Sequence, residues 1–181
     1  LHFFIILINL SSIFKSLSFN TFSIWFIVNI LVSPSLQSIT TSIYLSKSKT
    51  GGLIVLQKDV SSLSQSDVGV KINADVSQEL LLTIFFPKTP LHDGAVVIRD
   101  NKIISAGVLL PLTEDPKLSW RYGTRHRAAI GVSEVYPDCA CIVVSEETGA
   151  ISVAHNGTLE RNITSGELFE FVSAFLVLLP V

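Results

Sequence analysis

Hydrophobic and polar positions divide the chain into an apolar beginning and a more evenly mixed remainder. The first 32 residues, LHFFIILINLSSIFKSLSFNTFSIWFIVNILV, are rich in Phe, Ile and Leu and carry a single charge, Lys15. A membrane span needs about 20 predominantly apolar residues, and polar residues interrupt both halves of this segment. We predict one transmembrane helix near 17–32, preceded by the end of another. A cleaved signal peptide is the alternative, but the charged region that should begin it is missing.

After residue 33 the pattern predicts a linker followed by strands and helices. Residues 33–50 are rich in Ser and Thr, and we predict a linker that either is irregular or forms a helix after Pro34. The run GGLIVL at 51–56 suits a buried strand. In NADVSQELLLTIFFP (73–87) apolar residues recur on one helical face. We expect Asp75 to cap this helix, with Gln78 at the capping-box position.

The second half of the chain predicts more strands, two tight turns and two further helices. Asp100-Asn101 lies between two β-rich runs and predicts a hairpin, and Asn156-Gly157 marks a second turn. TRHRAAIGVSEV predicts a helix with Thr124 as N-cap, and SGELFEFVSAFLVLL predicts a closing helix. The fold class is therefore α/β: a single domain with a central mixed β-sheet flanked by helices, preceded by a hydrophobic N-terminal membrane segment. We divide the chain into a membrane segment (1–32), a linker (33–50) and a catalytic domain (51–181).

The distribution of charge changes this picture in two ways. Residues 1–50 contain Lys15, Lys47 and Lys49 and no acidic residue, whereas the whole chain has a net charge of −2. A general nucleic-acid binder would show a basic stripe, so this class is excluded. Lys47 and Lys49 follow the predicted span, and the positive-inside rule places the remainder of a cell-membrane protein in the cytoplasm.

His92, Asp93 and Gly94 stand together immediately before a predicted strand. An imidazole and a carboxylate are ligands suited to Mg²⁺ or Mn²⁺, and a glycine lets a phosphate approach the backbone. The alternative is a solvated turn, which a short motif of this kind does not exclude.

A second cluster of chemistry occurs in YGTRHRAAIG, where a helix begins with Arg125, His126 and Arg127. Cations in the first turn oppose the helix dipole, but the free N–H groups of a helix N-terminus bind phosphate well. Positions 125 and 127 lie about 200° apart around a helix, so the arginines should do different work. One would clamp phosphates and the other would brace a loop or a partner subunit, unless both simply pair with acidic residues of the preceding loop.

A third cluster, VVSEETG, places Ser145, Glu146 and Glu147 at the end of an apolar strand. Ligands collect at strand ends, and adjacent glutamates on an extended chain point to opposite sides, so one of them should face the site. A solvated turn explains the same residues equally well. No P-loop, G-x-G-x-x-G, H-E-x-x-H or G-x-S-x-G motif occurs.

Taken together, LHDGAVVI (91–98), TRHRAAIG (124–131) and VVSEETGAISVA (143–154) resemble, in this order and at these separations, the motifs of the diadenylate cyclase domain. The strand GGLIVL, the helix VSQELLLTIF and the segment VLLPL fit the same pattern, and the resemblance extends over roughly residues 45–175. Because the N-terminus is hydrophobic, the most similar type is the membrane-anchored bacterial diadenylate cyclase.

The resemblance implies an enzyme that condenses two ATP molecules into the second messenger cyclic di-AMP, releases two pyrophosphates and uses Mg²⁺ or Mn²⁺. It implies that His92 and Asp93 bind the metal and that Asp93, Arg125 and Arg127 are catalytic. The substrate-binding residues that it implies are Gly94, Ala95, Leu109, Leu110, Thr124, Arg125, His126, Ser145, Glu146 and Glu147. Among these, Leu109 and Leu110 would receive the adenine, and the residues from 124 to 126 would hold the triphosphate.

The expected partners follow from the product and from the N-terminus. A two-fold symmetric product requires two sites that face each other, so we expect a homodimer, with attachment to the membrane through residues 1–32. Two other functions remain open. A nucleotide-binding regulatory module without turnover is disfavoured by the intact Asp93, Arg125 and Arg127. A metal phosphohydrolase would need further metal-ligating histidines, and the other histidines offer no convincing second set.

Overall fold

Two fully buried strands, β1 (Gly52–Gln57) and β5 (Cys139–Val144), form the centre of the fold. Each is a nearly continuous run of apolar residues, as a strand with both faces covered requires. The computed structural model describes residues 34–58, 69–115 and 122–177. Within these residues the two strands lie in the middle of a seven-stranded sheet with the order β2-β4-β3-β1-β5-β6-β7.

The helices are distributed among groups of two or three consecutive strands along the chain. The remaining strands are β2 (Val70–Asp75), β3 (Ala95–Arg99), β4 (Lys102–Val108), β6 (Ile151–His155) and β7 (Thr158–Arg161). The helices are α3 (Pro34–Ser48), α4 (Gln78–Ile84), α6 (Thr124–Val135) and α7 (Ser165–Val177). This arrangement confirms the predicted α/β class with a mixed sheet flanked by helices.

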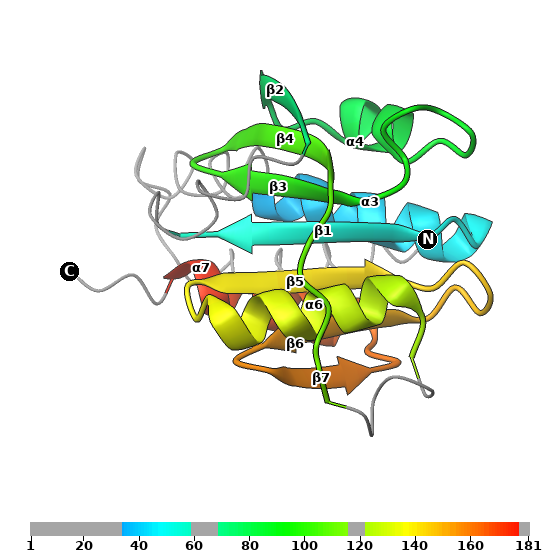
Figure 1. Ribbon diagram of the computed structural model, residues 1–181. Coiled ribbons are helices and arrows are strands. Elements are labelled where there is room, and N and C mark those ends of the chain that lie inside the picture. Colours follow the sequence, from blue (N-terminus) through cyan, green and yellow to red (C-terminus); the bar gives the residue numbers. More distant parts are fainter. Residues whose placement is uncertain (1–33, 59–68, 116–121, 178–181) are drawn as a thin grey trace, which may run out of the picture. The chain divides into compact units, whose positions relative to one another are not determined.

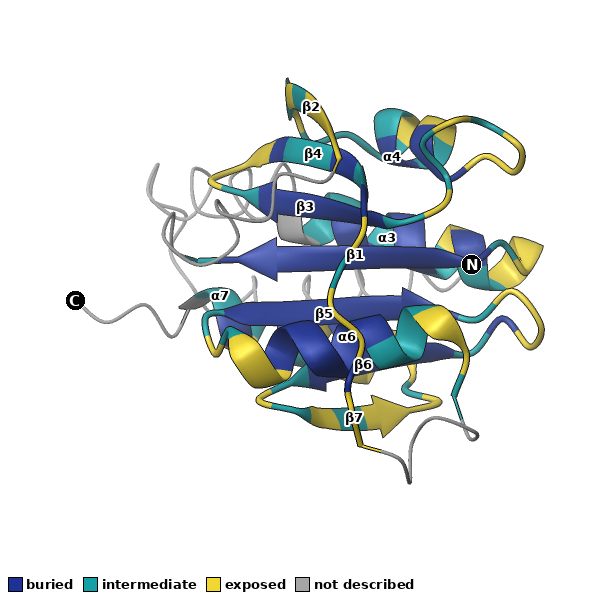
Figure 2. Cartoon of the chain, in the orientation of Figure 1, coloured by how far each residue is buried: buried dark blue, intermediate teal, exposed yellow. Residues whose placement is uncertain are grey.

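The helices cover the two faces of the sheet unequally (Figure 1). On one face α6 is the one helix among the described residues, and it packs through Ala128, Ala129 and Val132 against a cluster that includes both cysteines of β5. On the other face α3, α4 and α7 share a larger cluster, in which Phe85 is fully buried. Burial is therefore continuous across the central strands and decreases toward β2 and β7 (Figure 2).

The directions of the strands bring the starts of some strands and the ends of others to the same edge of the sheet. β1 and β3 are parallel, whereas β5 is antiparallel to β1, and the β5–β6 and β6–β7 pairs are also antiparallel. The starts of β1 and β3 therefore lie at the edge where β5 and β7 end. The beginning of α6 lies at this edge as well (Figure 1).

The predicted linker is helical after Pro34, which was one of our two expectations for it, and this helix, α3, forms part of the core. Ile39 and Leu45 are buried, and the hydroxyl residues Ser38, Thr41 and Ser42 are fully buried beside them. Ser42 Oγ donates a hydrogen bond to the carbonyl oxygen of Ser38 at 2.8 Å, so its hydroxyl is satisfied inside the helix. Serine and threonine can therefore line a tightly packed face of a helix. Because these residues are common in loops, the sequence did not predict that α3 would be buried.

The helix expected within 73–87 begins later than predicted. Asp75 is the last residue of β2 and pairs with Lys102 at 3.2 Å, so it does not cap the helix. The cap is Ser77, whose hydroxyl accepts a hydrogen bond from the backbone N–H of Leu80 at 3.2 Å. The antiparallel pairing of β2 with β4 extends to Asp75, which pairs with Lys102, so α4 starts later and is shorter than predicted.

Both predicted turns and the closing helix are confirmed. Asp100 and Asn101 connect β3 to β4 with positive φ angles of 48° and 68°, and Asn156-Gly157 connects β6 to β7 with φ angles of 49° and 72°. The predicted membrane segment, 1–32, lies outside the described residues. Among the helices that the structure does describe, none is long and apolar enough to cross a membrane.

Candidate functional site

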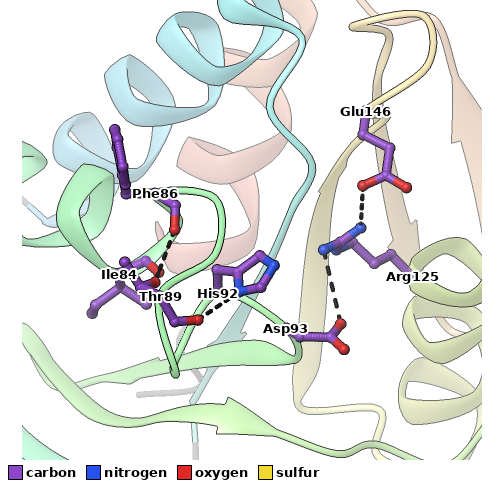
Figure 3. A network of polar contacts seen from close by, with 7 residues as sticks. All are labelled: Ile84, Phe86, Thr89, His92, Asp93, Arg125 and Glu146. Carbon is purple, nitrogen blue, oxygen red and sulfur yellow. Dashed lines mark hydrogen bonds and ion pairs between the residues drawn. The ribbon is translucent and has the colours of Figure 1, made fainter.

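His92 lies in the loop before β3 with one ring nitrogen already engaged. Its Nδ1 is 2.6 Å from the carbonyl oxygen of Thr89, and the Thr89 hydroxyl in turn donates to the carbonyl of Phe86 at 2.8 Å (Figure 3). A carbonyl oxygen only accepts, so Nδ1 must carry the proton and donate it. In the tautomer with this proton on Nδ1, Nε2 keeps its lone pair for another partner, which is the usual arrangement of a metal-ligating histidine.

Arg125 lies between two carboxylates that come from distant parts of the chain. Its guanidinium is 3.0 Å from Glu146 and 3.9 Å from Asp93 (Figure 3). The Arg125 side chain is only 20 % exposed, whereas that of Asp93 is 87 % exposed and that of Glu146 is 65 % exposed. The cation is thus fixed by the fold, while the two carboxylates remain open to a ligand.

Gly51 is a residue of this site that sequence reasoning missed. A Cβ atom at position 51 would lie 2.8 Å from Nη1 of Arg125 and 3.0 Å from Oε2 of Glu146. The absent side chain leaves the space that the ion pair occupies. No motif around Gly51 signals this, because the three residues meet only after β1 pairs with β5.

Thr124 is the first residue of helix α6 and not the residue before it, where an N-cap lies. The N-cap is Gly123, and no side chain among the described residues makes a capping hydrogen bond, so the predicted role of Thr124 as N-cap is wrong. Gly123 has no side chain that could accept a bond from the first turn. The free N–H groups of that turn are consequently open to an anionic ligand.

A cavity of about 250 Å³ opens between the start of α6 and the end of β5. It brings together many of the substrate-binding residues implied by the sequence, namely Thr124, Arg125, His126, Ser145, Glu146 and Glu147. Two further lining residues, Tyr122 and Arg161, were not predicted. Tyr122 begins the segment YGTRHRAAIG but was given no role there, and Arg161 reaches the cavity because β7 is the last strand on that side of the sheet.

His126 is kept neutral by its surroundings. Burial lowers the pKa of His126 below its ordinary value, and the positive charge of Arg161 lowers it further. The ring is stacked on Tyr122, with 6.2 Å between the ring centroids and 26° between the planes. At neutral pH His126 therefore offers an uncharged donor and acceptor, and the arginines supply the positive charge of the cavity.

Other residues implied by the resemblance lie outside this cavity. Gly94 and Ala95 begin β3, and Gly94 has a φ angle of +125°. Leu109 is 65 % exposed after β4, and Leu110 packs against the α6 side of the core. Arg127 does not line the cavity; its carbonyl accepts a hydrogen bond from the backbone N–H of Thr113 at 3.1 Å. Arg125 and Arg127 thus occupy different surroundings, as their angular separation predicted.

The described residues contain no group of three or more His, Cys, Asp or Glu side chains that could hold a metal ion. His92 and Asp93 supply two adjacent donors, a ring nitrogen and a carboxylate, and the tautomer of His92 suits metal ligation. The two donors fit a divalent cation as part of a ligand set, which other ligands would have to complete.

Comparison with known proteins agrees with these features. Residues 40–159 match the family model DAC, described as DisA bacterial checkpoint controller nucleotide-binding. The chain belongs to this DAC family. The match includes the loop before β3, the start of α6 and the turn after β5, so the motifs quoted from the sequence all lie within the family region.

Individual DAC relatives extend the comparison. Cyclic di-AMP synthase CdaA of Bacillus subtilis is 47 % identical over 141 residues, which make up 77 % of this chain and 51 % of that protein. A crystal structure of a double-cysteine variant of DacA from Staphylococcus aureus has a TM-score of 0.74 and 39 % identity, and the match covers 78 % of this chain and 94 % of that one. A structure described as a hypothetical membrane spanning protein from Bacillus cereus has a TM-score of 0.65 and 45 % identity, with 70 % and 62 % covered. The chain spans about half the length of the CdaA protein that it matches.

Proposed function

We propose that this DAC protein is a diadenylate cyclase, which condenses two ATP molecules into cyclic di-AMP and releases two pyrophosphates. The observation that carries the proposal is the fixed Arg125 guanidinium between the open carboxylates of Asp93 and Glu146, beside the uncapped start of α6. Family membership and the identity with a cyclic di-AMP synthase support it. A bare helix N-terminus and a fixed arginine bind phosphate, and an open carboxylate is available for metal or proton.

The reaction makes two phosphodiester bonds and breaks two phosphoanhydride bonds. Each ribose 3′-oxygen attacks the α-phosphorus of the other nucleotide, the bond from that phosphorus to the bridging oxygen breaks, and pyrophosphate leaves. The proton of each 3′-hydroxyl passes to a base. Catalysis of such a transfer consists mainly of positioning and charge neutralisation. In our proposal Arg125 neutralises phosphate charge, and Asp93 orients the attacking hydroxyl or accepts its proton.

His92 and Asp93 are the residues that would hold a divalent cation, Mg²⁺ or Mn²⁺. When bound, such an ion neutralises phosphate charge and makes a hydroxyl more acidic. The protonated Nδ1 of His92 supports this role, because its bond to Thr89 fixes the ring with Nε2 available. Asp93 contributes the hard oxygen donor that both ions prefer.

The remaining site residues extend along the nucleotide. Thr124, His126 and Ser145 would contact phosphates in the cavity, with Glu147 at its rim, while Gly94 and Ala95 would lie under the phosphates. The exposed Leu109, together with Leu110, would receive the adenine. Arg127 lies on a different face of α6 from Arg125 and would stabilise the loop before α6 or contact a second subunit.

Two requirements concern the whole protein. The product is two-fold symmetric, so we propose that two chains face each other as a homodimer during turnover. We also propose that residues 1–32 attach the protein to the cell membrane, with the catalytic domain in the cytoplasm. The name of the Bacillus cereus structure, a membrane spanning protein, supports the attachment.

The proposal is tested by incubating the complete chain with ATP and either Mn²⁺ or Mg²⁺ and identifying the products by mass. The complete chain is needed because α3 contributes Ile39 and Leu45 to the core, so truncation near residue 47 would expose that core. Cyclic di-AMP and pyrophosphate are expected in a 1:2 ratio. ADP or AMP would instead indicate a hydrolase, and bound but unchanged ATP would indicate a regulatory module.

Gly51→Ala should lower turnover with little loss of stability. The added methyl group must push aside Arg125 and Glu146, whose side-chain ends can move, so the fold tolerates it while the guanidinium shifts. Displacement of a positioning group by a fraction of an ångström to 1 Å costs on the order of tenfold to a hundredfold in rate. The measurement is the initial rate of cyclic di-AMP formation together with the melting temperature.

Arg125→Lys provides the control for this mechanism. If Gly51→Ala acts through the guanidinium, the loss from the double variant is smaller than the product of the two separate losses. Independent, multiplicative losses would show that Gly51 affects the site by another route.

A further inference from the structure

Arg161 is the last residue of the edge strand β7, and it lines the same cavity as Thr124, Arg125 and His126. Its side chain is exposed, and its guanidinium carbon lies 5.3 Å from the centre of the Tyr122 ring. A cation over an aromatic face is held in place but keeps its charge. Arg161 is therefore a charged group with a defined position at the cavity wall.

The charge of Arg161 differs from that of Arg125 in what surrounds it. Arg125 has carboxylates at 3.0 Å and 3.9 Å, whereas within the described ranges, 34–58, 69–115 and 122–177, no carboxylate forms an ion pair with Arg161. Its charge does act on the cavity, because it helps to lower the pKa of His126. The cavity thus contains one compensated and one uncompensated arginine, and only the second is free to pair fully with an anion.

The position of Arg161 in the sheet decides which part of a nucleotide it can reach. Only Gly94 separates Asp93 from the first residue of β3, and β7 is four places from β3 in the strand order. Neighbouring strands are about 4.8 Å apart, so the two strands are roughly 19 Å apart. Asp93 and Arg161 therefore cannot contact the same phosphate. If the reacting α-phosphate lies near Asp93, an extended triphosphate passes Arg125 and ends toward β7.

We propose that Arg161 binds the terminal phosphates of ATP, the part that leaves as pyrophosphate. The proposal rests on the diadenylate cyclase function and assigns a residue of β7 to the leaving-group end of that site. A guanidinium binds two phosphate oxygens at once, which suits this task better than a single ammonium group does. Tyr122 keeps the guanidinium turned toward the cavity.

The test compares Arg161→Gln with the wild-type complete chain by calorimetric binding of ATP, AMP and inorganic tripolyphosphate. Hydrogen bonds to a charged partner contribute enough that the affinity for ATP and for tripolyphosphate should fall about tenfold or more. The affinity for AMP should stay the same, because AMP has only the α-phosphate. Arg161→Lys should restore part of the loss, since it keeps the charge without the forked geometry.

The matched control is Lys102→Gln, which removes the same charge from a lysine that pairs with Asp75 on the β2–β4 side of the sheet. This variant should bind all three compounds as the wild type does. An equal loss for ATP and AMP in Arg161→Gln would mean that Arg161 only supports Tyr122 and His126, and this result would overturn the proposal. Unchanged binding of ATP would overturn it as well.

Titration of His126 by NMR gives a readout that is independent of nucleotide. In Arg161→Gln the pKa of His126 should rise partway toward its ordinary value, because burial, the larger cause, remains. An unchanged pKa would place the charge of Arg161 away from the cavity and contradict the proposal. The product assay separates the two ideas: binding that depends on Arg161 without formation of cyclic di-AMP would support the phosphate site and reject the cyclase.

Discussion

Asp93→Asn should reduce the formation of cyclic di-AMP by at least about 10³-fold while the protein stays folded. Asparagine has nearly the same shape but carries no charge, so it loses both the hard anionic metal donor and the ability to accept a proton. General acid–base catalysis alone contributes about 10²–10⁴-fold, and loss of a metal ligand adds to this. The rate is measured with saturating ATP and Mn²⁺, by mass or by pyrophosphate release.

The fold should tolerate Asp93→Asn because the native carboxylate contributes little to stability. Its side chain is 87 % exposed, and its ion pair with Arg125 is long at 3.9 Å. Exposed pairs of this kind contribute at most about 1 kcal/mol. Thermal unfolding followed by circular dichroism should therefore shift by only a few degrees, which separates a chemical defect from an unfolded protein.

Asp100→Asn is the matched control for the loss of one carboxylate. Asp100 lies in the turn between β3 and β4 with a φ angle of 48°, a conformation that asparagine adopts readily. Its only ion pair in the described part of the chain is with the neighbouring Arg99, at 3.7 Å. This variant should form cyclic di-AMP at the wild-type rate. Wild-type turnover in Asp93→Asn would refute the role of Asp93 as metal ligand and base.

Features of the fold that depend on local chemistry followed directly from the sequence. The apolar run before residue 57 suited a buried strand, as β1 confirms, and the two turns contain residues that accept positive φ angles. Asn156 and Gly157, for example, have φ angles of 49° and 72°. Each of these features is determined within a few residues, so long-range packing had no opportunity to override it.

Features that depend on tertiary packing did not follow from the sequence. We expected the serines and threonines of α3 to form a linker, possible as a helix, but we did not predict their burial, which arises because α4 and α7 pack against that helix. Asp75 looked like a helix cap, but pairing with β4 kept it in a strand and left the cap to Ser77. In both cases the residues have the local conformational preference that we assumed, but packing against a neighbouring element determined the structure that they adopt.

The candidate site shows the same division. The motifs identified Asp93, Arg125 and Glu146 individually, but their contact depends on β3 and α6 starting at the edge of the sheet where β5 ends. Gly51 and Arg161 carry no local signal, because their roles arise from the strand order β1-β5-β6-β7. The strand order of a mixed sheet therefore places residues in a site that the sequence motifs of that site do not identify.

Gly94→Ala should destabilise the fold by about 3 kcal/mol, in addition to disturbing the site. The φ angle of Gly94 is +125°, which a residue with a side chain rarely adopts. An added Cβ would also lie 2.6 Å from the carbonyl carbon of Gly107 and 2.9 Å from the nitrogen of Val108. These are backbone atoms and cannot turn away, so β3 and β4 would have to separate. The melting temperature should fall by roughly 6–12 °C.

Gly166→Ala is the control that separates this steric effect from the general effect of replacing glycine. In the described part of the chain, a Cβ at position 166 meets only the Thr164 hydroxyl, at 3.9 Å, and alanine favours the helical conformation of α7. This variant should melt at the wild-type temperature or slightly above it. A Gly94→Ala protein as stable as the wild type would show that β3 and β4 can move apart at this point. The only role left for Gly94 would then be to let a phosphate approach the backbone. A destabilised protein would mean that the same glycine first permits the strand pairing that places Asp93 opposite Arg125.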